Sequence, residues 1–352
     1  MRYKLLGRSG LRVSELCLGT MTFGEDWLFG ASKEESKQVF DAFADAGGNF
    51  IDTADFYTNG TSERFLGEFV GVGERRQEFV LATKYTLNSR PDDPNGGGNH
   101  RKSMHQALEA SLKRLGTDYI DLYWVHAWDF MTPVDELMRA LDDMVRAGKV
   151  LYVGISDAPA WIVSQANTLA DLRGWSPFVG LQISYSLIER TPERELLPMA
   201  KALDIAVTAW SPLGGGMLTG KYKRDTELPK EARYAQEAWS ADFFITDKNF
   251  TIAEEVETVA AEIGRTPAQV AISWIRRQTG KGIIIPIIGA RKLSQLRDNL
   301  AVLDFELGER QLTRLDEVSA IQLGFPHDFL SHDMVRPLVH GNRYALIDDH
   351  RG

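Results

Sequence analysis

Four ionisable side chains lie at or just past the C-terminal ends of three short apolar segments: Asp52, Tyr57, Lys84 and His126. A tyrosine hydroxyl has an ordinary pKa of about 10, which is too high for efficient proton exchange near neutrality. A neighbouring ammonium favours the phenolate and lowers that pKa, and a carboxylate behind the lysine keeps the lysine charged. A histidine adds a hydrogen-bond donor for a developing oxyanion. The set therefore indicates an acid that delivers a proton to a carbonyl oxygen, and hence a carbonyl-reducing enzyme.

Taken singly, each of these residues has an ordinary structural explanation. Asp52 suits a helix cap or a partner for any cation, a lysine at a strand end such as Lys84 is commonly solvated, and a loop tyrosine such as Tyr57 is commonly a packed ring. Their joint placement favours the catalytic interpretation, because the C-terminal ends of parallel barrel strands converge on one rim, where active sites are built.

Strand-like and helix-like segments alternate along the whole chain of 352 residues. The predicted strands cover 16–19, 49–52, 79–84, 119–126, 150–155, 179–183, 205–210 and 282–286. The predicted helices cover 34–47, 62–70, 104–115, 132–145, 158–169, 192–203, 252–263, 267–278, 293–300 and 309–318. Eight such units are the number that closes a (β/α)8 TIM barrel. An open doubly wound sheet is the alternative, and the absence of an obvious edge strand favours closure.

These segments predict an α/β protein of one domain over residues 1–352, with the barrel at about 15–320 and a C-terminal tail at 321–352. A long irregular stretch, 214–247, follows the seventh strand. Within it, 215–221 matches most of a phosphate-binding P-loop, but Tyr222 replaces the magnesium-binding Ser or Thr, so we do not expect a nucleoside triphosphate site.

Composition excludes several classes of function. The net charge of −9 and the scattered Lys and Arg argue against a nucleic-acid surface. No apolar segment approaches the ~18 residues of a membrane span, and the N-terminus lacks the features of a signal peptide. The single Cys17 excludes an internal disulfide, and its apolar surroundings predict a buried thiol. The chain is expected to be cytoplasmic.

Three segments resemble the signatures of the aldo-keto reductase family. Residues 48–57 followed by 62–67 resemble its first signature, 111–122 its second, and 287–291 with Gln295 and Asn299 its cofactor-phosphate segment. This resemblance implies a (β/α)8 barrel that transfers a hydride from NADPH to a small-molecule carbonyl substrate without a metal. It also implies that Tyr57 is the general acid, that Lys84 and Asp52 tune it, and that His126 orients the carbonyl.

The cofactor site is predicted at the ends of strands rather than at a Rossmann fingerprint, because no Gly-x-Gly-x-x-Gly follows any strand. Asp157 stands where the family more commonly has Asn, so it can accept a hydrogen bond from a carboxamide but not donate one when ionised. Trp210 matches a residue whose ring stacks on nicotinamide, with a merely packed indole as the alternative. The predicted cofactor-binding residues are Gly19, Thr20, Met21, Ser156, Asp157, Gln182, Trp210, Ser211, Pro212, Leu213, Gly215, Gly289, Arg291, Gln295 and Asn299.

Arg291 precedes a predicted helix, and a guanidinium there favours a 2′-phosphate and therefore NADPH/NADP+ over NADH. A solvated surface arginine is the alternative. No acidic residue that would oppose NADPH lies in 289–295. The remaining histidines lack ligand spacing, so we do not expect a metal site.

The apolar substrate cleft is predicted to contain Phe23, Trp27, Trp128 and Phe130, whereas Trp124 falls inside a strand and is expected in the core. A second hypothesis of another class is an NADPH-binding, redox-sensing accessory subunit with little turnover. Such relatives carry the same cofactor motifs, so turnover with a carbonyl substrate distinguishes the two. The sequence indicates neither the oligomeric state nor the individual substrate.

Overall fold

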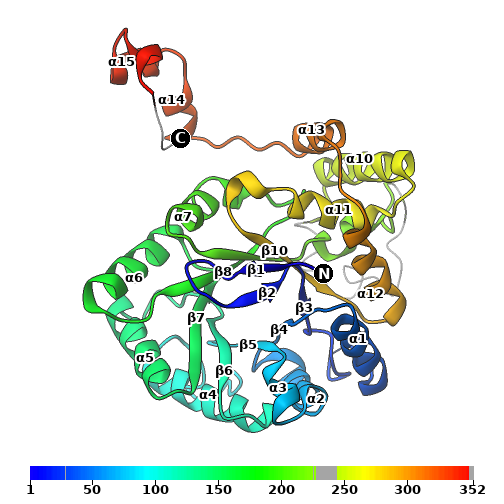
Figure 1. Ribbon diagram of the computed structural model, residues 1–352, viewed down its shortest axis with the longest axis vertical. Coiled ribbons are helices and arrows are strands. Elements are labelled where there is room, and N and C mark those ends of the chain that lie inside the picture. Colours follow the sequence, from blue (N-terminus) through cyan, green and yellow to red (C-terminus); the bar gives the residue numbers. More distant parts are fainter. Residues whose placement is uncertain (28, 225, 227–243, 349–352) are drawn as a thin grey trace.

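The computed structural model describes residues 1–27, 29–224, 226 and 244–348, and its centre is a closed barrel of parallel strands (Figure 1). The barrel strands are β3 (Cys17–Gly19), β4 (Phe50–Asp52), β5 (Val80–Tyr85), β6 (Ile120–Val125), β7 (Val150–Ser156), β8 (Phe178–Ser184), β9 (Ala206–Trp210) and β10 (Ile284–Gly289). Each strand pairs with its sequence neighbours, and β10 pairs with both β9 and β3 to close the ring. The predicted (β/α)8 barrel is confirmed, and the open sheet is excluded.

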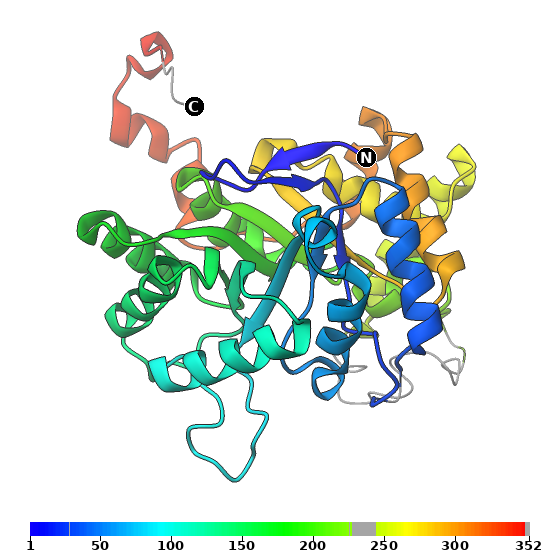
Figure 2. The ribbon, with the colours of Figure 1, turned by 60° about the horizontal axis from the view of Figure 1, so that its bottom comes forward.

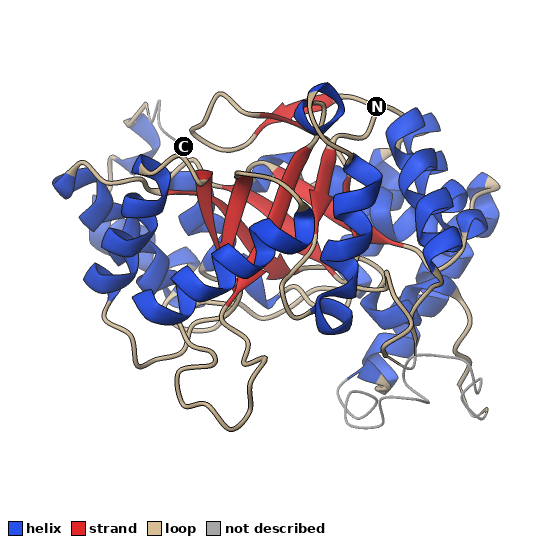
Figure 3. Ribbon diagram, turned by 90° about the horizontal axis from the view of Figure 1, so that it is seen from below, coloured by secondary structure: helices blue, strands red, loops and turns tan. Residues whose placement is uncertain are grey.

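Helices form the outer layer of the barrel (Figure 3). They are α1 (Lys33–Asp45), α2 (Thr61–Val70), α4 (Arg101–Leu115), α5 (Val134–Arg146), α6 (Ala160–Arg173), α7 (Leu196–Ala202), α10 (Asp247–Ile263), α11 (Pro267–Arg276) and α12 (Leu293–Leu300). Their ends differ from the predicted ends by a few residues. Helix α4 begins earlier than predicted because His100 caps it, accepting the Ser103 N–H on its imidazole. A short helix, α3 (Glu74–Gln77), was not predicted.

An antiparallel hairpin of β1 (Tyr3–Leu5) and β2 (Arg12–Ser14) covers the N-terminal end of the barrel (Figure 2). Leu6 and Val13 of this hairpin are fully buried and pack in one apolar cluster with barrel residues, including Phe50 and Trp124. The N-terminal end is therefore filled with side chains, and the site must open at the opposite end, where the strands terminate.

Trp124 is the largest side chain inside the barrel, and it is fully buried, as predicted. Two glycines make room for its indole. A Cβ at Gly154 would lie 2.4 Å from the Trp124 ring, and one at Gly180 would lie 2.7 Å from it. These glycines are needed because the ring occupies the space that their side chains would fill.

The irregular stretch predicted at 214–247 begins with a short 3-10 helix, η3 (Gly214–Thr219), and its residues 225 and 227–243 lie outside the described part of the chain. Helix α13 (Glu309–Val318) packs against α10, and the chain then leaves the barrel (Figure 1). The tail forms α14 (His327–Ser331), α15 (Val335–His340) and η6 (Tyr344–Leu346). Across the described residues, the helices are all too short or too polar to span a membrane.

We expect Gly154→Ala to lower the free energy of unfolding by about 1–3 kcal/mol, because its methyl group would overlap the enclosed Trp124 ring. A fall in melting temperature, followed by circular dichroism, measures this loss. Gly280→Ala is the control, since a Cβ at that position meets nothing within 4 Å. Equal melting temperatures for the two variants would contradict this account of the barrel interior.

Candidate active site

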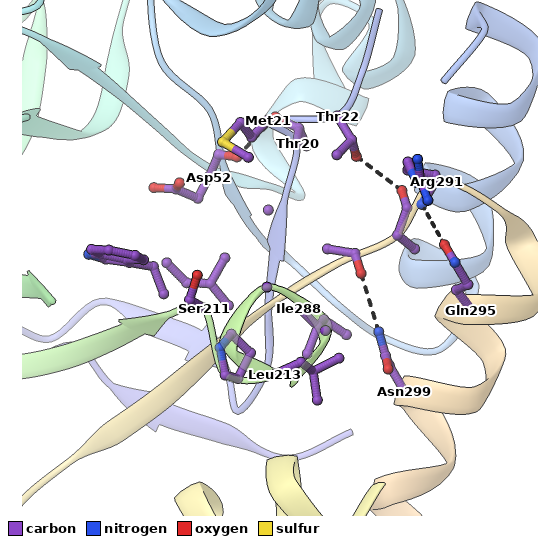
Figure 4. A pocket seen from close by; sticks show the side chains of 18 of the residues that line it. Thr20, Met21, Thr22, Asp52, Ser211, Leu213, Ile288, Arg291, Gln295 and Asn299 are labelled. Atoms are coloured by element: carbon purple, nitrogen blue, oxygen red, sulfur yellow. Dashed lines mark hydrogen bonds between the residues drawn. The ribbon is translucent and has the colours of Figure 1, made fainter. Parts of the chain in front are cut away.

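A cavity of about 870 Å³ opens at the C-terminal ends of the barrel strands (Figure 4). We call it the main cavity. Asp52, Tyr57 and His126 line it, and so do all fifteen residues predicted to bind the cofactor. Its size lies within the range of about 300–1,000 Å³ that is usual for ligand sites. Residues from distant parts of the sequence thus share one hollow.

Lys84 joins the predicted catalytic residues into one hydrogen-bonded group. Its ammonium donates to Asp52 Oδ2 at 2.5 Å, to the Thr53 carbonyl at 2.8 Å and to Tyr57 Oη at 3.0 Å. Lys84 has no exposed surface. The Tyr57 and His126 rings meet edge to face with centroids 5.8 Å apart. The four side chains are therefore neighbours, although Asp52 and His126 lie 74 positions apart in the sequence.

Burial and ion pairing act in opposite directions on Lys84. Burial lowers the pKa of its ammonium, but attraction to Asp52 and Tyr57 outweighs burial, so the pKa rises above its ordinary value. Asp52 is held from its other side, because Gln182 Nε2 donates to Asp52 Oδ1 at 2.9 Å. Lys84 is accordingly charged throughout the neutral range. The Gln182 contact links a predicted cofactor residue to the catalytic group, and the sequence analysis missed it.

The hydroxyl of Tyr57 departs from the expectation. Burial raises the pKa of Tyr57, and the opposing effect of the Lys84 ammonium is smaller, so the net pKa lies above the ordinary value. The prediction that Lys84 brings this pKa below its ordinary value is therefore wrong. The consequence is a phenol that keeps its proton at neutral pH and can act as a donor.

His126 is a neutral imidazole. Burial and the nearby Lys84 hold its pKa well below the ordinary value. Its Nδ1 is buried, with no hydrogen-bond partner among the described residues, and its backbone N–H donates to the Tyr85 carbonyl at 3.0 Å. A neutral imidazole carries one N–H donor and one acceptor. His126 can therefore donate a hydrogen bond to a ligand without adding a second positive charge beside Lys84.

At the end of β7, Asp157 adopts φ +43° and accepts a hydrogen bond from Trp210 Nε1 at 3.1 Å. Both side chains line the main cavity. Burial raises the pKa of Asp157, while the Trp210 bond and the charge of Lys84 lower it in part. This side of the cavity therefore combines an indole face, a carboxyl group and the Gln182 amide.

Across the cavity, the loop after β10 meets the start of α12 (Figure 4). Gln295 Oε1 accepts the Arg291 N–H at 2.9 Å, and Asn299 Nδ2 donates to the Gly289 carbonyl at 3.3 Å. Thr22 Oγ1 donates to the Ala290 carbonyl at 3.2 Å and ties this loop to the loop after β3. A guanidinium and a helix N-terminus here suit an anion.

Asp298 also lines the main cavity, and it lies outside the segment 289–295 in which an acidic residue was sought. Its position three residues after Gln295 on the same helix is the signal that could have found it. Its carboxylate accepts hydrogen bonds from Thr266 Oγ1 at 3.0 Å and from Gln269 Nε2 at 2.7 Å. Protein donors thus satisfy both of its oxygens.

These groups fit a phosphorylated dinucleotide. Such a ligand needs a cationic anchor for phosphate at one end and polar groups around a flat ring at the other. Arg291 could provide the first, and Gln182, Asp157 and the Trp210 face could provide the second, since all four line the cavity. The opening is continuous between them and contains the predicted loop residues 211–213.

Only one of the four residues predicted to contact substrate lies on the main cavity. Trp27 lines it, with its ring centroid 6.3 Å from that of Tyr57. Phe23 is instead fully buried and packs edge to face on Phe69 at 6.3 Å. Trp128 and Phe130 line a separate cavity of about 460 Å³. Proximity to a strand end therefore did not determine which way these aromatic rings point.

Three apolar side chains that the sequence analysis missed also line the main cavity: Phe29, Phe56 and Leu87. The Trp27 ring lies 5.8 Å from the Phe29 ring and 5.9 Å from the Phe56 ring, centroid to centroid. The mouth of the cavity beside the predicted acid is therefore aromatic.

Asp55, two residues before Tyr57, is a half-buried residue whose carboxyl group the catalytic set does not use. Burial, and after it the neighbouring Glu63, raise the pKa of Asp55 to about 8. Its Oδ1 has no hydrogen-bond partner among the described residues. Native Asp55 therefore holds a proton over a pH range in which an unfolded chain has lost it.

We expect the wild-type protein to lose stability as pH rises from about 4 to 8, because of Asp55, and we expect Asp55→Asn to lack this dependence on pH. In that window the native state binds one more proton at Asp55 than the unfolded state, so the free energy of unfolding falls with rising pH. The gain for the variant at pH 8 is on the order of 2–5 kcal/mol. Melting temperatures at pH 5 and pH 8 measure it. Asp45→Asn, at an exposed position, is the control, and a similar response in both variants would contradict the assignment.

Comparison with known proteins agrees with this geometry. Residues 15–320 match the model of the aldo/keto reductase family. A norsolorinic acid reductase of Emericella nidulans is 39% identical over 330 residues, which cover 92% of this chain and 82% of that protein. An aryl-alcohol dehydrogenase of Pestalotiopsis microspora is 37% identical over 340 residues, covering 94% and 85% respectively. A putative aryl-alcohol dehydrogenase of Saccharomyces cerevisiae is 34% identical over 343 residues, covering 94% and 90%. The chain belongs to the aldo-keto reductase family.

Proposed function

We propose that this protein is an NADPH-dependent reductase of aldehydes or ketones in which Tyr57 is the general acid. Membership of the family establishes an oxidoreductase that acts on small-molecule carbonyl compounds. The observation that carries the finer proposal is the contact of Lys84 Nζ with Tyr57 Oη at 3.0 Å and with Asp52 Oδ2 at 2.5 Å, beside an open cavity.

In this mechanism the substrate carbonyl oxygen accepts hydrogen bonds from Tyr57 and from the neutral imidazole of His126. NADPH, when bound, supplies the hydride. As negative charge develops on the carbonyl oxygen, Tyr57 transfers its proton there. The phenolate that remains is stabilised by the Lys84 ammonium, which Asp52 keeps charged. Water returns the proton to Tyr57 after turnover.

The residues that would hold NADPH are those at the two ends of the main cavity. Arg291 would bind the 2′-phosphate, and Trp210 and Gln182 would hold the nicotinamide. We also propose that the protein works in the cytoplasm, where a reduced, buried Cys17 is stable.

The substrate class within this proposal is an aromatic aldehyde or ketone. Trp27, Phe29 and Phe56 form an aromatic wall next to Tyr57. Flat rings pack well against such a wall, and an offset aromatic pair contributes about 0.5–1.5 kcal/mol beyond its buried area. Several similar proteins are named aryl-alcohol dehydrogenases, which is consistent with this class.

We expect Tyr57→Phe to lower kcat for a benzaldehyde substrate by about 100-fold to 10,000-fold, the usual contribution of a positioned general acid. The Kd for NADPH should change little, because the hydroxyl serves the substrate. NADPH absorbance follows turnover, and protein fluorescence follows binding. Tyr3→Phe, at a half-exposed tyrosine on the opposite end of the barrel, is the matched control.

A Tyr57→Phe variant with unchanged turnover would remove Tyr57 from the mechanism. Wild-type protein that binds NADPH but oxidises it with no aldehyde or ketone of a broad panel would instead support the redox-sensing subunit.

We expect Arg291→Ala to raise KM for NADPH about 10-fold to 100-fold and to leave KM for NADH nearly unchanged. The lost interaction is a charge-assisted hydrogen bond to phosphate, which contributes about 1.5–3 kcal/mol. Steady-state kinetics with both cofactors measures the ratio. Arg297→Ala, on the helix that follows Arg291 and outside the lining of the main cavity, is the control. Equal effects of Arg291→Ala on both cofactors would refute 2′-phosphate recognition by Arg291.

A further inference from the structure

Three carboxylates of the described residues line the main cavity, and they differ in their surroundings. Asp52 is paired with Lys84. Asp298 is held by Thr266 and Gln269 on the Arg291 side. Asp157 has no cation within salt-bridge distance among the described residues, and a neutral donor, Trp210 Nε1, binds one of its oxygens. Asp157 and Asp298 both lack a salt-bridge partner among the described residues, and they differ in the side of the cavity on which they lie.

Asp157 also lies on the side of the cavity where the chemistry takes place. It follows the last residue of β7, and its backbone N–H donates to the Gln182 carbonyl at 3.2 Å. The charge of Asp157 contributes to the raised pKa of Tyr57. The charge of Lys84 in turn offsets part of the rise in the pKa of Asp157. In the proposed mechanism, the ring that gives a hydride to a carbonyl held by Tyr57 would share the main cavity with this carboxylate.

The reaction changes the charge of that ring. Reduction moves a hydride from neutral dihydronicotinamide to the carbonyl carbon and a proton from Tyr57 to the carbonyl oxygen. The products are the alcohol, the Tyr57 phenolate, which water reprotonates, and NADP+, whose nicotinamide carries one positive charge. All other charges of the cofactor are the same before and after the transfer.

We propose that the Asp157 carboxylate stabilises the positive charge of oxidised nicotinamide, so that the protein binds NADP+ in preference to NADPH and favours departure of the hydride. This inference rests on the proposed function. Opposite charges a few ångströms apart attract each other, and a ring seated against Asp157 would cover a side chain that is otherwise exposed to solvent. A carboxylate on the Tyr57 side of the cavity can respond to this one-charge difference. The 2′-phosphate and Arg291 do not respond to it, because the phosphate carries the same charge in both forms of the cofactor.

The build-up of positive charge on the nicotinamide during the reaction gives Asp157 a catalytic role as well. Positive charge accumulates on the ring as the hydride leaves, so an anion placed beforehand beside the ring lowers the energy of the transition state relative to the ground state. An asparagine at this position would provide no such charge.

The test is the ratio of the Kd values for NADP+ and NADPH, measured by fluorescence titration of wild-type protein and Asp157→Asn. Asparagine keeps an oxygen for Trp210 and tolerates positive φ, so the variant preserves the local fold. We expect the Kd for NADP+ to rise about 10-fold, which corresponds to about 1.4 kcal/mol, and the Kd for NADPH to change less than about twofold.

Two further variants sharpen this test. Asp157→Glu retains the charge and should keep the ratio near that of the wild type. Asp298→Asn removes a charge of the same size on the other side of the cavity and should affect both forms equally. A single-turnover measurement of NADPH oxidation should show slower hydride transfer in Asp157→Asn.

An unchanged NADP+/NADPH ratio in Asp157→Asn overturns the inference and leaves the proposed function standing, because the wild-type protein still binds and oxidises NADPH. A ratio that shifts equally in Asp298→Asn also overturns it, since the effect would then be one of overall charge. Wild-type protein that binds neither cofactor form overturns the proposed function and this inference together.

Discussion

The buried ion pair of Lys84 and Asp52 is the interaction on which the site depends. An ammonium with no exposed surface is costly, and here it is compensated by the 2.5 Å contact to Asp52, by the Thr53 carbonyl and by Tyr57. Gln182 occupies the second oxygen of Asp52, so the carboxylate is satisfied on both sides. Loss of one partner of such a pair leaves an unpaired buried charge, which typically costs about 3–5 kcal/mol. The network that prepares the proton donor is therefore also part of the core.

The closed barrel is what brings this network together. Asp52 ends β4, Lys84 lies near the end of β5, and the two strands are hydrogen-bonded neighbours. Gln182 reaches Asp52 from β8, which closure places across the ring. At the N-terminal end, the β1–β2 hairpin and the Trp124 ring fill the interior. Packing at one end thus leaves the other end for chemistry.

The sequence was most informative where residue type and strand end coincide. Strand ends gave the position of Asp52 and Lys84, because register in a parallel barrel follows from strand order. The sequence was least informative where the role of a residue depends on the direction of its side chain or on its burial. Phe23 and Trp27 are close in sequence, but one ring enters the core and the other faces the cavity. Phe130 adopts φ +56°, which no pattern of apolar residues indicates, and it lines the separate cavity of about 460 Å³. The pKa of Tyr57 required knowledge of burial, which residue spacing cannot supply.

The two influences on Tyr57 have separate uses in one proton transfer. Burial raises the pKa of Tyr57 and so keeps the hydroxyl protonated while the cavity waits for a carbonyl oxygen. Lys84 has the opposite effect, and its ammonium becomes most valuable after the proton has left, when it faces a phenolate at hydrogen-bond distance. An acid that was already ionised could not donate, and one with no cation behind it could not release its proton. The same low-dielectric surroundings serve both requirements, because they disfavour an isolated charge and strengthen a paired one.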